Sequence, residues 1–214
     1  MLTRIAGAYV LVALACAVSP SPAAAVVIYN EAISGDLSNN GLSPTPLSVS
    51  LGSNEVLGVT GRTDGVVDRD YFNITVPGGA VLSAITVLPG TMPGAAVSFI
   101  AIQAGNQVTV PTDTTTAAGL LGFKLYQVSD INSDILDDIG ASGNGSSGFT
   151  PPLGAGSYAF WVQELAVGRY PYGFDLVLRA ATAVPEPSSA AAAMVGLVAA
   201  GLTRRRRAKA QLEA

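Results

Sequence analysis

The stretch DYFNITVPGGAVLSAITVLPG, residues 70–90, alternates apolar and polar side chains on both sides of a short turn. Phe72, Ile74 and Val76 point to one face of an extended chain, whereas the residues between them point to the other face. The Pro-Gly-Gly sequence at 77–79 supplies turn residues before the next apolar run. This period of two predicts two strands joined by a hairpin-like connection.

The same alternation recurs through the middle of the chain. It is found in PLSVSLG (46–52), AVSFIAIQAG (96–105), FKLYQV (123–128), GSYAFWVQE (156–164) and YGFDLVLR (172–179). In GSYAFWVQE it places Tyr158, Phe160 and Val162 inward and Trp161 outward. We therefore expect an all-β fold over residues 26–183: a single antiparallel β-sandwich of about eight or nine strands, without a helix between the two ends.

The composition excludes several classes of protein. The 214 residues include no histidine, which removes the Ser-His-Asp triad and imidazole-bound zinc. The one cysteine, Cys16, lies in the N-terminal apolar run, so the mature chain would have no thiolate nucleophile. Residues 26–183 hold five basic and thirteen acidic residues, which disfavours nucleic-acid binding. These features predict a protein that is not an enzyme.

The N-terminus has the pattern of a secretory signal peptide over residues 1–25. Arg4 precedes an apolar run over 6–18, and small residues then form the cleavage site. Ala23 and Ala25 predict export through the Sec translocase and cleavage before Val26. The alternative, a lipid attached at Cys16, usually needs leucine three residues earlier, where this chain has alanine.

The C-terminal residues 184–214 form a second segment outside the domain. Its parts, in order, are Val184, Pro185, Glu186 and Pro187, an apolar run over 190–202, and Arg204, Arg205, Arg206 and Arg207. Thirteen apolar residues make a helix of roughly 20 Å, which is short of the ~30 Å hydrocarbon core. The arginines would remain cytoplasmic. This order predicts a weak, transient membrane anchor with the domain outside, and an apolar helix that is separate from the fold.

This three-part tail resembles the PEP-CTERM sorting signal of Gram-negative bacteria. The resemblance implies an exported protein that is held in the inner membrane as a precursor and processed near the Pro-Glu-Pro by an exosortase. It also implies a final location in the cell envelope, on the outer surface or in the extracellular matrix of a biofilm. The run over 190–202 is richer in alanine than such tails often are, which suggests a weaker anchor.

The middle of the chain resembles the bacterial pre-peptidase C-terminal domain, a β-sandwich appended to secreted peptidases and surface proteins. The matching stretches are GVVDRDYFNITVPGG (65–79), FKLY (123–126), GAGSYAFWV (154–162) and YGFDLVL (172–178). Residues 105–121 and 141–148 depart from the compact pattern of that family.

Two sets of residues are candidates for ligand binding. Asp68 and Asp70 lie two apart before a strand, so they are weak calcium candidates or solvated turn acids. Trp161 is a candidate for stacking on a sugar, although a strand tryptophan also packs against a loop or a second sheet. We expect no cofactor other than, at most, calcium.

The sequence thus predicts an exported, non-enzymatic envelope or matrix protein that is sorted by an exosortase. The alternative is a carbohydrate-binding or calcium-assisted adhesion module, which would have extracellular polysaccharide as its partner. A third class, a secreted hydrolase with paired carboxylates, has no particular pair to support it.

Overall fold

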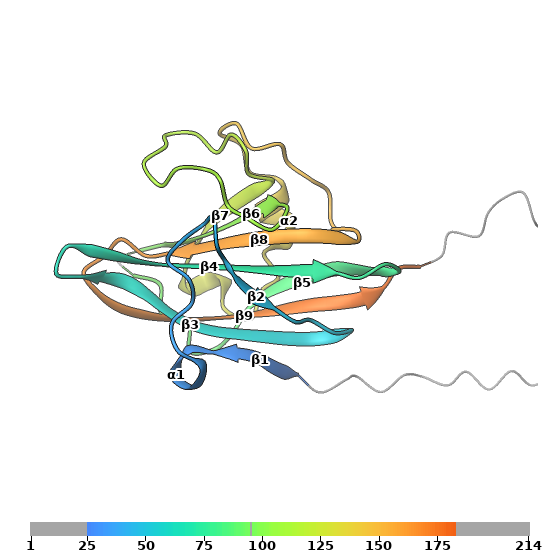
Figure 1. Cartoon of the computed structure of the whole chain (residues 1–214), viewed down its shortest axis with the longest axis horizontal. Helices are drawn as coiled ribbons and strands as arrows, with labels where there is room; N and C mark the ends of the chain where they lie inside the picture. The colour runs from blue at the N-terminus through green and yellow to red at the C-terminus, as the bar shows by residue number, and fades with distance from the viewer. Residues whose placement is uncertain (1–24, 95, 183–214) are drawn as a thin grey trace, which may run out of the picture.

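The computed structural model describes residues 25–94 and 96–182 (Figure 1). The predicted signal helix and the predicted sorting tail from Val184 onward lie outside the described residues. The elements, in chain order, are β1 (Val26–Asn30), α1 (Glu31–Ser34), β2 (Thr45–Leu47), β3 (Gly52–Thr63), β4 (Val66–Val76), β5 (Ala80–Val87), β6 (Ser98–Ala104), β7 (Gly122–Tyr126), a 3-10 turn (Val128–Asp130), α2 (Leu136–Gly140), β8 (Gly156–Gln163) and β9 (Gly168–Ala180). The described chain is therefore mostly β, as the alternation predicts.

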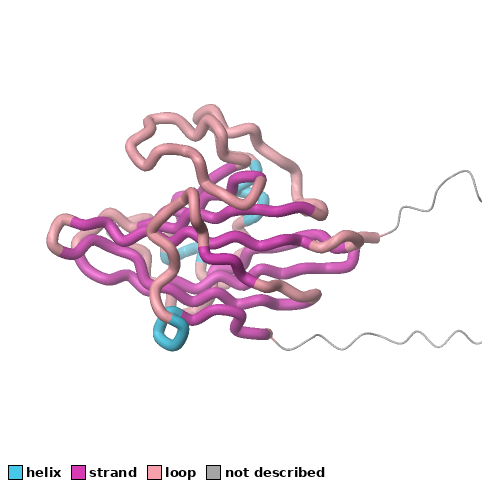
Figure 2. The backbone as a smooth tube through the Cα atoms, viewed as in Figure 1, coloured by secondary structure: helices cyan, strands magenta, loops and turns pink. Residues whose placement is uncertain are grey.

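The strands form one curled sheet in the order β5-β9-β3-β4-β8-β6-β7, and all neighbours along this path are antiparallel. β1 adds to β3 and β2 adds to β4, both in parallel. β4 joins the two halves of the sheet: residues 66–68 pair with β3, whereas residues 69–76 pair with β8. Figure 2 shows the strands running along the long axis of the domain.

The turn at residues 77–79 does not make the hairpin that its sequence predicts. β4 pairs with β3 and β8, whereas β5 pairs with β9 in the other half of the sheet. The turn is tight, with the Ala80 N–H bonded to the Pro77 carbonyl at 3.1 Å. It carries the chain across the core to the other half of the sheet instead of back along the same half, because β4 and β5 each bury an apolar face against the opposite half.

The main core lies between the two halves. Phe72 of β4 stacks on Phe160 of β8 with ring centroids 4.7 Å apart, and both side chains are fully buried. The opposite half contributes Val56, Phe174 and Leu176, which are also fully buried. The inward-facing positions that the alternation predicts in β4, β8 and β9 all belong to this core.

A second, smaller cluster lies on the outer face of the β4-β8-β6 half. Trp161 is on this face, as its position predicts, but it is only 4% exposed. Val108, Val110 and Leu120, from the long connection between β6 and β7, cover it. Figure 1 shows this connection arching over the sheet. The sheet therefore buries side chains on both faces here.

The expectation of no helix between the two ends was wrong. α1 has four residues and α2 has five, so neither is long enough to produce a helical period in the sequence. α1 starts where the Asn30 side chain accepts the Ala32 N–H at 3.0 Å, and it ends at Gly35, whose φ is 91°. This short helix shapes the loop that forms part of the site described next.

Candidate metal centre

Asp70 is a buried carboxylate without a hydrogen-bond partner. It lies on β4, two residues before Phe72, so the strand directs its side chain toward the interior. Its exposed fraction is 0%, and neither of its carboxylate oxygens has a partner among the described residues. An unpaired buried polar group costs about 1–3 kcal/mol, and a charged group costs more. Asp70 is therefore a position where a bound proton or cation would relieve an unfavourable arrangement.

The segment that follows β1 brings two more carboxylates to Asp70. One carboxylate oxygen from each of Glu31, Asp36 and Asp70 lies within 4.8 Å of the other two. Glu31 is the first residue of α1, and Asp36 follows the glycine that ends the helix. The Tyr29 hydroxyl donates to the Gly35 carbonyl at 2.9 Å and holds this loop closed. We call Glu31, Asp36 and Asp70 the acidic trio.

Backbone donors fix Glu31 in place. One of its carboxylate oxygens accepts the Leu37 N–H at 3.1 Å, and the other accepts the Val59 N–H at 2.7 Å. The first bond orders the loop, and the second ties the loop to β3. Carboxylate oxygens have further lone pairs, so both remain able to bind a cation. The fold therefore holds the Glu31 carboxylate in place before any ligand arrives.

Burial dominates the electrostatics of the trio. Burial first, and then the neighbouring Glu31, raise the pKa of Asp70 to about 9, against the opposing effect of the Tyr172 hydroxyl. Burial also raises the pKa of Glu31, against the effect of its two backbone donors. Among the described residues, the ion pairs are those of Lys124 with Asp130 and Asp138, so none neutralises the trio. A proton or an added cation has to do so.

Tyr172 of β9 completes the buried side of the site. Its hydroxyl lies near Asp70, is buried, and has no hydrogen-bond partner of good geometry in the described chain. Gly58, its cross-strand neighbour on β3, leaves the space that the tyrosine occupies. A Cβ at position 58 would lie 2.5 Å from the Tyr172 hydroxyl oxygen. Gly58 is therefore needed for the position of a side chain that adjoins Asp70.

The donor set suits a hard divalent cation. Calcium takes about six to eight oxygen ligands from carboxylates, carbonyls and water. The trio offers carboxylate oxygens only, and Asp36 is exposed, so water can complete the coordination. The trio includes no imidazole or thiolate, the ligands that softer transition metals prefer. Glu31, Asp36 and Asp70 are the residues that would hold calcium.

The structure brings together a different set from the pair that the sequence suggests. Asp70 belongs to the trio, but Asp68 does not: its carboxylate accepts the Asn39 side-chain N–H at 3.2 Å. Burial and the nearby Asp36 raise the pKa of Asp68, so it adds to the negative field around the trio. Glu31 and Asp36 were missed because no local pattern links them to a strand that far along the chain.

Comparison of the chain with protein-family models, with curated proteins and with solved structures finds no match. Over residues 25–94 and 96–182, no helix combines the length and the apolar character that crossing a membrane requires.

Proposed function

We propose that this chain is an exported, non-enzymatic protein of a Gram-negative envelope or extracellular matrix, and that its β-domain binds calcium at the acidic trio. The observation that carries the calcium assignment is Asp70, whose buried carboxylate has no partner and faces Glu31 and Asp36. We also propose that the domain is a β-sandwich similar to the pre-peptidase C-terminal domain. The packing of the two halves of the sheet over one core supports this.

Calcium at this position would join two parts of the chain that are distant in sequence. Glu31 and Asp36 come from the segment after β1, which includes α1, and Asp70 comes from β4. Extracellular calcium modules bind with dissociation constants of about 10⁻⁴ to 10⁻³ M, which suits an exported protein. Such an ion would fasten the N-terminal segment to the sheet and stabilise the folded domain by mass action. This is the calcium-assisted form of the predicted adhesion module.

The sorting proposal rests on the C-terminal sequence. Pro-Glu-Pro, an apolar run and four arginines follow the domain in the order that exosortase substrates have. The Ala181 N–H bonds to the Gly79 carbonyl at 2.8 Å, and Val184 comes three residues later in the sequence. Cleavage near Pro187 would therefore leave the hydrogen bonds of the described domain intact. The start of β1 and the end of β9 also lie at the same end of the domain in Figure 1.

The non-enzymatic assignment is supported by the trio itself. A hydrolase with paired carboxylates needs both groups within reach of the substrate. Asp70 is 0% exposed, so a substrate bond cannot reach it in this arrangement. The domain has no histidine or cysteine to supply another general base or nucleophile. A bound cation accounts for the burial of Asp70 better than catalysis does.

Calcium titration of the full-length chain in detergent tests the proposal. Millimolar calcium should raise the thermal unfolding midpoint of the wild-type chain, and Asp70→Asn should abolish this response. Asp68→Asn is the matched control, because it removes one carboxylate from the same strand outside the trio and should keep the response. An equal calcium response in wild type and Asp70→Asn would overturn the assignment.

A further inference from the structure

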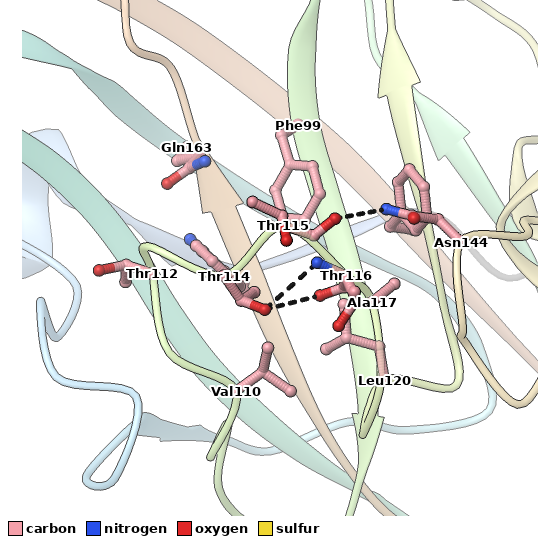
Figure 3. Close-up of a pocket in the computed structure, with 12 residues that line it drawn as sticks. Phe99, Val110, Thr112, Thr114, Thr115, Thr116, Ala117, Leu120, Asn144 and Gln163 are labelled. Carbon is pink, nitrogen blue, oxygen red and sulfur yellow. Dashed lines mark hydrogen bonds between the residues drawn. The ribbon is translucent and has the colours of Figure 1, made fainter.

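The connection between β6 and β7 encloses a pocket on the outer face of the sheet. The Val108 N–H bonds to the Gly41 carbonyl at 2.7 Å, and the Ala117 N–H bonds to the Asn144 carbonyl at 2.7 Å. These bonds fix both ends of the segment 109–116. A pocket of about 160 Å³ lies beneath it (Figure 3). This pocket involves none of the acidic trio.

The floor of the pocket is aromatic and held by the sheet. Trp161 lies on β8, Phe99 on β6 and Phe123 on β7, so three neighbouring strands each present one ring. The centroids of Phe99 and Trp161 are 5.0 Å apart in an edge-to-face arrangement, and those of Phe99 and Phe123 are 5.9 Å apart. Trp161 is nearly covered, whereas Phe99 and Phe123 are half-buried, so an apolar ligand face would meet chiefly the two phenylalanine rings, with the tryptophan packed beside them.

The rim of the pocket is polar and uncharged. Its hydrogen-bonding side chains are Thr112, Thr114, Thr115, Thr116, Asn144 and Gln163. Figure 3 shows that the Thr114 hydroxyl is occupied within its own turn and that the Asn144 amide donates to the Thr115 carbonyl. The side chains of Thr112 and Thr115 are exposed, so their hydroxyls are accessible to a ligand. No charged side chain lines the pocket, so its polar groups suit a neutral ligand.

One donor in the floor lacks a partner. The indole N–H of Trp161 is buried and has no hydrogen-bond acceptor among the described residues. The indole can only donate, so an oxygen acceptor that reached it from the pocket would satisfy this N–H. A ligand that combines an apolar face with several hydroxyl oxygens would match both the floor and this donor.

We propose that this pocket binds one neutral pyranose ring of a polysaccharide. The carbon–hydrogen face of the ring would lie on the aromatic floor, and its hydroxyls would meet the threonine and amide groups of the rim. A neutral sugar fits because the pocket offers hydroxyls and amides but no charge to neutralise a charged group. The site is independent of the calcium proposal, since the two use different residues.

The single tryptophan of the chain provides the test. Trp161 is the only tryptophan in the sequence, so tryptophan emission reports directly on the floor of the pocket. The full-length chain, in a detergent without a sugar headgroup, is titrated with glucose, galactose, mannose and N-acetylglucosamine. At least one of these should produce a saturable change in emission.

Variants locate the binding. The double variant Thr112→Val, Thr115→Val keeps the shape of both side chains and removes two hydroxyls. It should therefore weaken sugar binding by at least about threefold. Thr150→Val is the matched control, because this exposed threonine lies outside the pocket, and it should bind like wild type. No emission change with any of the four sugars, or an affinity that the double variant leaves unaltered, would overturn the proposal.

Discussion

The carboxylates of Glu31 and Asp70 face each other within 4.8 Å, although they belong to a helix after β1 and to the middle of β4. Glu31 is held there by the N–H groups of Leu37 and Val59, whereas Asp70 has no partner. Glu31 is half-buried and Asp70 is buried, so a negative charge on both is unfavourable without a counter-ion. The stability of the domain therefore depends on what neutralises them, and this dependence can be measured.

The first prediction concerns pH in the absence of calcium. Asp70 has a pKa of about 9 in the folded chain and roughly 4 in the unfolded chain, so the folded state binds the proton more tightly. Below about pH 4 the group is protonated in both states, and its contribution to stability is fully present. As the pH rises from about 4 to about 9, this contribution is lost at up to roughly 1.4 kcal/mol per pH unit. Above the folded pKa the loss levels off.

Urea unfolding with a chelator, compared between wild type and Asp70→Asn, isolates this effect from the other acids. The free energy of unfolding of wild type should fall relative to that of the variant as the pH rises from about 4 to about 9. At pH 8 the variant should be the more stable protein, by several kcal/mol. A difference that stays constant with pH would contradict the raised pKa of Asp70.

The second prediction concerns Gly58. A Cβ there would lie 2.5 Å from the Tyr172 hydroxyl oxygen, so Gly58→Ala should destabilise the domain by about 1–3 kcal/mol. It should also weaken calcium binding, because Tyr172 adjoins Asp70. Gly78→Ala is the control: nothing lies within 4 Å of the added Cβ, so its unfolding midpoint and calcium affinity should match wild type. Equal behaviour of the two variants would show that Tyr172 moves aside without cost.

The third prediction concerns the core. Phe160 is fully buried and stacks on Phe72, so Phe160→Ala should lower the free energy of unfolding by about 3–5 kcal/mol. Phe99 lies on the outer face and is only partly buried, so Phe99→Ala should cost less. Chemical denaturation of both variants in saturating calcium checks this order. A larger loss of unfolding free energy for Phe99→Ala than for Phe160→Ala would contradict the assignment of the main core to the inner face of the sheet.

Side-chain faces could be predicted from the sequence, but strand partners could not. Alternation depends only on neighbouring residues, and it placed Phe160 inward and Trp161 on the opposite face. The turn at 77–79 can reverse the chain equally well within one half of the sheet or across the core, and only the pairing of β5 with β9 decides between the two. The predicted hairpin failed for that reason.

The candidate sites depended on contacts between distant segments. Asp70 was identified because it adjoins the clear alternation that follows it, and the structure places it within β4, whereas Glu31 and Asp36 lie in a short helix and the turn after it, with no periodic signal. Trp161 was correctly placed on the outer face, but its cover comes from a connection without regular structure, so its burial could not be predicted. Local pattern therefore found one member of the trio and one residue of the pocket floor.

The last prediction concerns processing of the precursor. In the described residues, the last backbone hydrogen bond near the C-terminus is donated by the Ala181 N–H, and Val184 to Pro187 begin three residues later in the sequence. Burying an arginine in the bilayer centre costs about 2.5–3.5 kcal/mol, so Arg204 to Arg207 should stop translocation and leave the Pro-Glu-Pro outside the membrane. We expect the mature extracellular protein to begin at Val26 and to end near Pro187, or to be joined there to another molecule.

Mass spectrometry of both termini, from fractions of the native host, measures this outcome. Deleting the exosortase should leave a membrane-bound precursor that retains the four arginines. Replacing Pro185, Glu186 and Pro187 with alanine should have the same effect in the wild-type host, because it removes the processing sequence and leaves the apolar run and the arginines. Alanine replacement of Ser188 and Ser189 is the control and should be processed normally. Extracellular protein that still carries Arg204 to Arg207 would contradict sorting by this tail. That result would leave the calcium proposal standing, because the rise in unfolding midpoint with calcium depends on the domain alone.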